Sequence, residues 1–279
     1  MTATRTSAVR PAVTRRMVVC DLDGTLLTSA GRISPRSRAA LRAVRRAGWP
    51  LLLGTARPVR DTRAIAVAID PMMVAVCGNG SITYDFGRHR IVDEQPIPAA
   101  GLAATLQVLR AAHPGVRFGA ERGLDLLLEH DFVLDAALSR TAQRVARLDR
   151  VVDERGFGKV IAQLDGAAPD YWPTIAAVLP AALTATVSTT AFCEIGRSGV
   201  TKAAAVRRIA ERAGIAAADV VAFGDMPNDL PVLAWAGTAV AVANAHPAVL
   251  NAADIVTGAN DDDGVAQVLE LLLRGGATP

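Results

Sequence analysis

Acidic side chains follow two short apolar runs that lie far apart in the sequence. Asp21 and Asp23 come at the end of the first run, and Asp225 and Asp229 come shortly after Val220–Phe223. Carboxylates crowded at one place repel and raise one another's pKa, and a hard cation removes that cost. Mg²⁺ is suited to such a place, because it binds oxygen ligands and keeps waters beside one or two carboxylates and phosphate oxygens. The competing interpretation of Asp23 is a turn that makes only local hydrogen bonds.

A phosphate group would explain two further polar residues. Thr55 follows an apolar run, and we expect its hydroxyl and the next amides to be free to bind an anion. Lys202 lies at the predicted start of a helix, where amides and an ammonium group both attract phosphate oxygens. Neither glycine-rich nucleotide-binding pattern occurs, and no Cys/His spacing suits zinc. The sequence therefore favours a hard cation beside a phosphate.

These polar residues all follow predicted strands of one sheet. Short apolar runs bounded by turn residues are typical of buried parallel strands, and here they alternate with helices. Ser34-Pro35 is a typical helix start. The pattern predicts a Rossmann-like, doubly wound α/β sheet with its ligand at the carboxyl ends of the strands. The predicted strands are 17–20, 51–53, 73–77, 220–223, 238–242 and 254–256, and the helices that follow them include 34–48, 201–214, 245–252 and 265–273.

The alternation of predicted strands and helices changes after Tyr84. Residues 85–190 mix predicted helices at 99–112 and 171–179 with predicted strands at 116–120, 124–129 and 159–164, and prolines are denser there. We interpret this segment as an α+β domain inserted into a core domain made of residues 17–84 and 191–279. Its polar candidates for substrate contact are Glu121, Arg122, Glu129 and His130.

Composition limits the class of protein. The chain has 279 residues, of which 51% are hydrophobic and 20% are charged, so it can form a large core and is not a disordered chain. No apolar run is long enough for a membrane-spanning helix, which needs roughly 18 residues. The formal net charge is +3, but residues 1–16 contain four arginines and no acid. The remaining chain is therefore close to neutral, which argues against a nucleic-acid partner.

Residues 1–16 are interpreted as a disordered basic tail, with an organelle transit peptide as the alternative. The three cysteines, Cys20, Cys77 and Cys193, lie in or beside apolar stretches and form no C-x-x-C pair. We therefore expect buried, reduced thiols. Together with the absence of a secretory signal, this predicts a cytoplasmic protein.

Four segments in this order resemble the motifs of the haloacid dehalogenase-like (HAD) phosphohydrolases. They are Asp21-Leu22-Asp23-Gly24-Thr25, Gly54-Thr55-Ala56-Arg57, Lys202, and Gly224-Asp225-x-x-Asn228-Asp229. Gly78-Asn79-Gly80 and two segments near the C-terminus, 240–245 and 260–264, resemble the Cof-type branch. In that branch a cap domain is inserted between the second and third motifs, where residues 85–190 lie in this chain.

The resemblance implies a Mg²⁺-dependent phosphatase that acts on a small phosphomonoester, either a sugar phosphate or a phosphorylated cofactor. Asp21 would be the nucleophile and Asp23 the general acid and base. Mg²⁺ would bind Asp21, the main-chain carbonyl of Asp23, and Asp225. The remaining implied roles are phosphate binding by Thr55, Lys202, Asn228 and the Ala56 amide, and support by Asp229, Arg57 and Asn79, of which Asn79 is expected mainly to hold a turn.

Three positions depart from the family pattern: Ala56 replaces the usual glycine of the second motif, Ala203 follows Lys202 where the family often has glycine, and Cys20 stands where phenylalanine is common. None of these changes removes a reacting group. Several alternatives stay open beside the phosphatase. A phosphomutase or phosphotransferase would share the aspartyl-phosphate, and a protein that has lost turnover would only bind phosphorylated metabolites. Asp23 argues against a dehalogenase, and the sequence does not indicate the oligomeric state.

Overall fold

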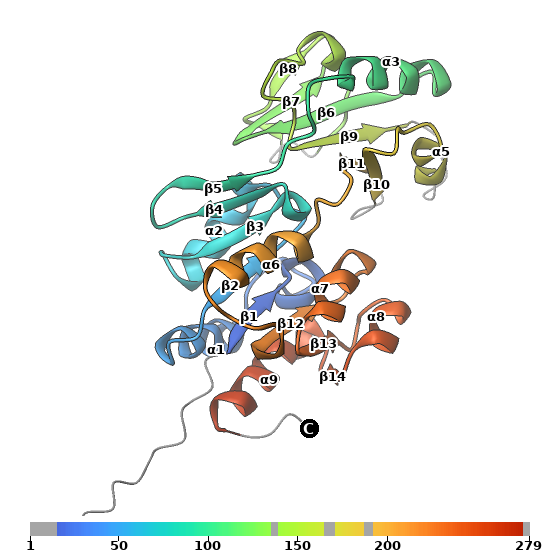
Figure 1. The fold of residues 1–279 in the computed structure, drawn as a ribbon. Helices are drawn as coiled ribbons and strands as arrows, with labels where there is room; N and C mark the ends of the chain where they lie inside the picture. The colour runs from blue at the N-terminus through green and yellow to red at the C-terminus, as the bar shows by residue number, and fades with distance from the viewer. Residues whose placement is uncertain (1–15, 135–138, 165–170, 187–191, 276–279) are drawn as a thin grey trace, which may run out of the picture.

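The computed structural model describes residues 16–134, 139–164, 171–186 and 192–275. Its strands form two separate sheets, one of eight strands and one of six, which lie in the lower and upper parts of Figure 1. We call them the core sheet and the cap sheet. The predicted α/β class with a parallel sheet is confirmed. The predicted tail at 1–16 lies, except for Arg16, outside the described residues.

The core sheet has the strand order β14-β13-β12-β1-β2-β3-β4-β5. All neighbours from β14 to β3 are parallel, whereas β4 and β5 add an antiparallel edge. Its strands are β1 (Met17–Cys20), β2 (Leu51–Gly54), β3 (Val74–Cys77), β4 (Ile82–Asp85), β5 (Arg90–Glu94), β12 (Val220–Gly224), β13 (Thr238–Val242) and β14 (Ile255–Thr257).

The chain order reverses between β1 and β12, which are neighbours at the centre of the sheet. From β1 the chain proceeds through β2 and β3 toward one edge, and from β12 it proceeds through β13 and β14 toward the other. Cys20 is aligned with Phe223, so both strands end at the same level. Such a switch in strand order is where open α/β sheets bind ligands.

Helices cover the core sheet in two groups. Helix α1 (Pro35–Arg46) contacts α2 (Val59–Ile69) and α9 (Gly264–Leu273). Helix α6 (Lys202–Arg212) contacts α7 (Leu230–Trp235), which also contacts α8 (Pro247–Ala252). The predicted start of α1 is confirmed, because the Ser34 hydroxyl accepts a hydrogen bond from the Ser37 amide at 2.9 Å. The three cysteines are buried and free, as predicted.

The cap sheet has the order β10-β11-β9-β6-β7-β8, and only the β7–β8 pair is parallel. Helices α3 (Leu102–Ala112) and α5 (Trp172–Ala176) belong to this part of the chain (Figure 1). Its strands are β6 (Arg117–Arg122), β7 (Asp125–Glu129), β8 (Gln143–Val145), β9 (Lys159–Gln163), β10 (Leu183–Thr186) and β11 (Cys193–Arg197).

The two sheets divide the chain at other points than the predicted boundaries at 84 and 191. Strand β5 pairs with β4 and so belongs to the core sheet, whereas β11 pairs with β9 and β10 in the cap sheet. The physical reason is antiparallel pairing, since β5 returns along β4 after a short turn and extends the core sheet. A change of sequence texture does not reveal such a hairpin. Strands β8, β10 and β11 were not predicted.

Gly80 brings the turn after β3 against the start of α6. Its φ is +106°, and a Cβ built there would lie 2.3 Å from the Thr201 carbonyl oxygen. Thr201 is the N-cap of α6, since its hydroxyl accepts a hydrogen bond from the Ala204 amide. The absence of a side chain at Gly80 therefore allows the helix that carries Lys202 to approach this turn.

We predict that Gly80→Ala destabilises the protein more than Gly31→Ala does. Both glycines have positive φ, but a Cβ at Gly31 would meet nothing within 4 Å. The shared backbone strain costs roughly 1–2 kcal/mol, and the clash at Gly80 should add about 1–3 kcal/mol. Urea unfolding of the two variants measures the difference. Equal losses would show that the close approach to Thr201 does not constrain the fold.

Candidate active site

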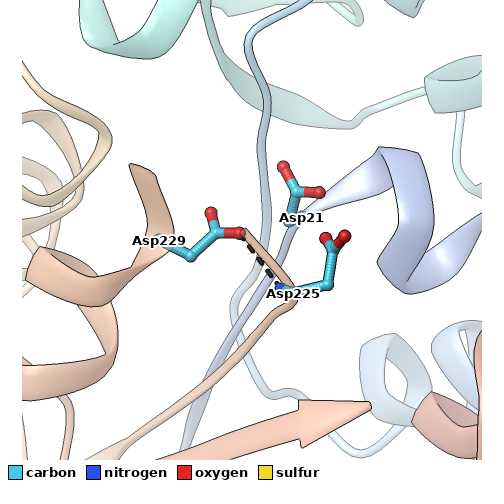
Figure 2. A group of neighbouring side chains, drawn as sticks. All are labelled: Asp21, Asp225 and Asp229. Carbon is cyan, nitrogen blue, oxygen red and sulfur yellow. Dashed lines mark hydrogen bonds between the residues drawn. The ribbon is translucent and has the colours of Figure 1, made fainter. Parts of the chain in front are cut away.

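Two carboxylates lie at the switch point because they follow neighbouring strands. Asp21 comes directly after β1 and Asp225 directly after β12, and both are buried, with 7% and 6% of their surface exposed. Asp229 follows one turn after Asp225 and is 1% exposed. Figure 2 shows the three side chains gathered at the strand ends. One carboxylate oxygen of each lies within 4.8 Å of the others.

One buried lysine neutralises part of this acidic cluster. Lys202, the first residue of α6, donates hydrogen bonds from Nζ to Asp21 Oδ1 at 2.5 Å and to Asp229 Oδ1 at 2.7 Å. Burial by itself would lower the pKa of Lys202, but the two adjacent carboxylates raise it above its ordinary value. The lysine therefore stays charged.

Asp229 holds the loop that follows β12. Its Oδ2 accepts hydrogen bonds from the amides of Asp225 at 3.1 Å and Met226 at 3.2 Å, and Figure 2 marks the first of these. Its Oδ1 accepts the bond from Lys202. Both oxygens of Asp229 therefore have partners within the protein, which makes it a positioning residue for Lys202 and Asp225.

The remaining two acids fit a divalent cation. Burial raises the pKa of Asp21 well above its ordinary value, although Lys202 opposes this, and it raises the pKa of Asp225 to about 6, although the Thr25 hydrogen bond opposes that. Three buried carboxylates, those of Asp21, Asp225 and Asp229, lie near a single ammonium group, so further positive charge would stabilise their ionised forms. Hard oxygen donors from two strands are the ligands that Mg²⁺ prefers.

The turn after Asp21 leaves room for Asp225. Leu22–Leu26 forms one wide turn, closed by a hydrogen bond from the Leu27 amide to the Leu22 carbonyl at 2.8 Å. Gly24 has a φ of +76°, and a Cβ there would lie 2.2 Å from Asp225 Oδ2. Thr25 donates to Asp225 Oδ1 at 2.7 Å. The turn therefore packs on Asp225 and orients it.

The carboxylate of Asp23 pairs with Arg57. The guanidinium forms two hydrogen bonds with the carboxylate, Nε to Oδ2 at 2.7 Å and Nη2 to Oδ1 at 2.5 Å. The Asp23 side chain is 56% exposed, so the pair contributes little to stability but fixes the direction of the carboxylate. Arg57 thus has an orienting contact with the predicted acid, whereas the predicted metal contact of the Asp23 carbonyl stays a prediction.

The second motif lies beside the first because β2 is the neighbour of β1. Thr55 is buried, and its hydroxyl accepts a hydrogen bond from the Arg57 amide at 3.1 Å. The Thr55 amide donates a hydrogen bond to the Val76 carbonyl, and the Thr55 carbonyl accepts one from the Asn79 amide. The hydroxyl is therefore the group of this residue that can still donate a hydrogen bond. Ala56 is half-buried and lines the same cavity as Asp21. The structure therefore brings the predicted phosphate-binding segment to the acidic cluster.

Asn79 and Asn228 contact each other rather than standing apart. Asn228 donates from Nδ2 to Asn79 Oδ1 at 3.1 Å, and Asn79 donates from its own Nδ2 to Glu194 Oε2 at 2.7 Å. Asn228 Oδ1 is buried and has no hydrogen-bond partner among the described residues. Asn79 also has a φ of +54° inside the predicted turn. It therefore both holds the turn and links the core sheet to the cap sheet.

The cap sheet contributes charged residues that sequence analysis missed. Lys159 is 6% exposed and donates to the Ala56 carbonyl at 3.0 Å and to Glu194 Oε1 at 2.7 Å. Its Nζ also lies 3.6 Å from Glu121 Oε1, and Arg60 approaches the same oxygen at 3.9 Å. The sequence offered one signal for Lys159, since a lysine begins the otherwise apolar strand β9. It offered none for Glu194, which lies on β11, a strand that was not predicted.

Of the four cap candidates, only Glu121 lines the cavity above Asp21. Arg122 packs on the Phe157 ring at 4.8 Å, and Glu129 is buried against Arg110 and backbone amides within the cap. His130 is exposed. The positions of Arg122, Glu129 and His130 therefore do not support a contact with the substrate.

A cavity of about 740 Å³ opens over Asp21 and Asp23. Its lining combines strand residues of the cap sheet with residues of the loops and helices that follow the core strands, Lys202 and Asn228 among them. That volume is in the range of ligand pockets, roughly 300–1,000 Å³. Two carboxylates, Asp21 and Asp23, and the ammonium group of Lys202 therefore line one ligand-sized cavity.

A family model described as haloacid dehalogenase-like hydrolase matches residues 18–269. The chain belongs to this family. Its curated relatives include the pyridoxal phosphate phosphatase YbhA of Escherichia coli K12, 28% identical and covering 92% of this chain and 98% of that protein. A phosphoglycolate phosphatase of Methanothrix thermoacetophila is 27% identical, with 93% and 97% covered. These matches confirm the predicted HAD-type phosphatase class of enzyme.

Solved structures agree with this assignment. A haloacid dehalogenase-like hydrolase from Bacteroides thetaiotaomicron has a TM-score of 0.79 and 25% identity, and the match covers 92% of this chain and 99% of that one. Among the residues that the structure of this HAD protein describes, none of the helices has the length and apolar content to cross a membrane.

We predict that Asp229→Ala strongly destabilises the metal-free protein. The change leaves two backbone amides without their acceptor and removes half of the charge that pairs with buried Lys202, for a loss of about 3–5 kcal/mol. Asp93→Ala is the matched control, because Asp93 pairs with partly exposed Arg208 at 2.8 Å and should cost no more than about 1 kcal/mol. Guanidinium unfolding in chelator compares them, and similar losses would contradict a positioning role for Asp229.

Proposed function

We propose that this HAD protein is a Mg²⁺-dependent phosphatase that hydrolyses a small phosphomonoester, a sugar phosphate or a phosphorylated cofactor, through an aspartyl-phosphate on Asp21. The observation that carries the proposal is the environment of Asp21, which is buried at the cavity floor against Lys202, with Asp23 two residues later. Asp21 pairs with Lys202, but it also adds a third buried carboxylate to the cluster, a cost that its structural contact alone does not explain. Its use as a nucleophile explains why it is present.

In the first step an Asp21 oxygen attacks phosphorus, and the bond from phosphorus to the ester oxygen breaks. Asp23 gives its proton to the departing alkoxide, so the leaving group departs as a neutral alcohol. In the second step Asp23 takes a proton from water, and the water oxygen attacks phosphorus and releases Asp21 and inorganic phosphate. Arg57 supports both steps, because its two hydrogen bonds orient Asp23.

The phosphoryl oxygens would bind Lys202, the Thr55 hydroxyl, the Ala56 amide and Asn228. Lys202 is already placed beside Asp21, and a phosphate entering there gains an ammonium group that needs no rearrangement of the backbone. Asp21, the Asp23 carbonyl and Asp225 would hold Mg²⁺. When bound, the cation supplies positive charge that offsets repulsion between Asp21 and the phosphate and stabilises the transition state.

Cytoplasmic location and a small-molecule partner remain parts of this proposal. The phosphomutase and phosphotransferase alternatives share the Asp21 step and differ in what accepts the phosphoryl group. Water as the acceptor gives inorganic phosphate, whereas a second alcohol gives a new ester.

We predict that Asp21→Asn abolishes phosphate release from all substrates while the protein stays folded, because the amide is a poor nucleophile and is nearly isosteric. Release by the wild type should need Mg²⁺ and stop in chelator. The measurement is inorganic phosphate from a panel containing glucose 6-phosphate, pyridoxal 5′-phosphate and flavin mononucleotide. Asp93→Asn is the control with unchanged activity, since Asp93 pairs with Arg208 away from the cavity. Full activity of Asp21→Asn would exclude the covalent mechanism.

We predict that Asp23→Asn separates the two steps. With p-nitrophenyl phosphate the leaving group needs no proton, so phosphorylation of Asp21 should persist, whereas hydrolysis of the aspartyl-phosphate should slow by about 10²–10⁴-fold. Rapid mixing should then show a burst of one equivalent of p-nitrophenolate per active site, followed by slow turnover. A variant with neither a burst nor phosphoenzyme, despite normal folding, would contradict the role of Asp23 in the second step.

A further inference from the structure

We propose that Asn244 is a positioning residue for the cation site at Asp21 and Asp225. This inference rests on the proposed function, because it assumes that a divalent cation binds these carboxylates. It follows from hydrogen bonds that tie the loop after β13 to the turn after Asp21 and to the main chain of Asp225. Asn244 lies in the segment 240–245, which takes no part in the proposed mechanism.

The side chain of Asn244 holds the middle of the turn that follows Asp21. Its Nδ2 donates a hydrogen bond to the Gly24 carbonyl at 2.7 Å. That carbonyl belongs to the peptide group between Gly24 and Thr25, so the hydrogen bond fixes the orientation of this peptide group. Gly24 has a φ of +76° and no side chain to restrict it, and a partner outside the turn therefore does more to fix its conformation.

The two residues that this peptide group joins both lie against the carboxylate of Asp225. A Cβ built on Gly24 would lie 2.2 Å from Asp225 Oδ2, and the Thr25 hydroxyl donates to Asp225 Oδ1 at 2.7 Å. A rotation of the peptide group would therefore change both contacts at once. Asn244 thus acts on the direction of this carboxylate through the turn.

The loop that carries Asn244 also holds the main chain of Asp225. The His246 amide donates a hydrogen bond to the Asp225 carbonyl at 2.8 Å. This loop follows β13, which pairs with β12, the strand that ends directly before Asp225. Residues 244–246 therefore bind both the turn after β1 and the residue after β12, and they set the separation of the two segments.

The segment after β14 holds Asn244 in the orientation that this contact needs. The Asn260 amide donates to Asn244 Oδ1 at 2.9 Å, and Asn260 Nδ2 donates to the Leu27 carbonyl at 2.8 Å. A backbone amide can only donate, so the atom that faces it is the side-chain oxygen of Asn244. The side-chain nitrogen therefore points to Gly24, and the two asparagines together hold the turn at its middle and at its end.

These contacts should matter more for cation binding than for folding. Asn244 is exposed, and a hydrogen bond that water can replace adds little to stability. Mg²⁺ requires near-ideal octahedral geometry, whereas Ca²⁺ accepts variable coordination. Both cations carry the same charge, so a shift of Asp225 relative to the turn should weaken the binding of Mg²⁺ more than that of Ca²⁺.

The test measures cation binding to the substrate-free protein after a chelator has removed bound metal. The electron paramagnetic resonance signal of free Mn²⁺ reports Mn²⁺ binding, and competition then gives the Kd of Mg²⁺ and of Ca²⁺. Asn244→Ala should raise the Kd of Mg²⁺ by about tenfold and that of Ca²⁺ by less. The control is Asn251→Ala, which changes an exposed asparagine of α8 and should preserve both Kd values.

Asn244→Asp is the second variant, because it keeps the acceptor for the Asn260 amide and loses the donor to the Gly24 carbonyl. Its added charge acts on both cations alike, so the ratio of the two Kd values should shift in the same direction as in Asn244→Ala. An unchanged ratio in the variants that fold would overturn the role of Asn244 and leave the cation site in place. If the wild type binds no Mn²⁺, the proposed Mg²⁺ dependence fails, and this inference fails with it.

Discussion

The rest of the site depends on one buried ammonium group placed between two carboxylates. Lys202 contacts both Asp21 and Asp229, which precede and follow it in the chain by 181 and 27 residues. Without the lysine, three acids would share a space of less than 5 Å at the end of two strands. The pairing of β1 with β12 brings the carboxylates together, and the start of α6 supplies the lysine that offsets their repulsion. The folded protein therefore needs both features at once.

The cluster of three carboxylates and one lysine has an excess of negative charge. Asp229 uses its two oxygens on Lys202 and on the loop after β12, so its role is local and structural. Asp21 and Asp225 keep capacity for further positive charge, and the raised pKa of Asp225, about 6, is the consequence of its burial. A divalent cation and the phosphate of a substrate carry opposite charges, so binding both changes the balance less than binding either alone.

Much of the core could be predicted because its signals are local. Asp21, Thr55, Asn79 and Asp225 each follow a short apolar run, and parallel strands bring such ends to one edge. The cap could not be predicted to the same depth, because its polar cavity residues meet through antiparallel register between distant strands. Glu194 reaches Lys159 only because β11 pairs with β9, and β11 has no strong strand pattern of its own. Strand β5 belongs to the core sheet although it lies beyond the predicted boundary at residue 84, because its hydrogen bonds to β4 leave no signal in the composition of the chain.

The two sheets are joined at the residues that would bind phosphate. Lys159 of the cap donates to the carbonyl of Ala56, and Glu194 of the cap accepts from Asn79, which in turn accepts from Asn228. Ala56 and Asn228 are both expected to contact the phosphoryl group. Under the proposed function, a leaving group that competes for Glu194 or Lys159 would act on the same hydrogen bonds that hold Ala56, Asn79 and Asn228. Recognition of the leaving group and placement of the phosphate would then be coupled through two short chains of hydrogen bonds.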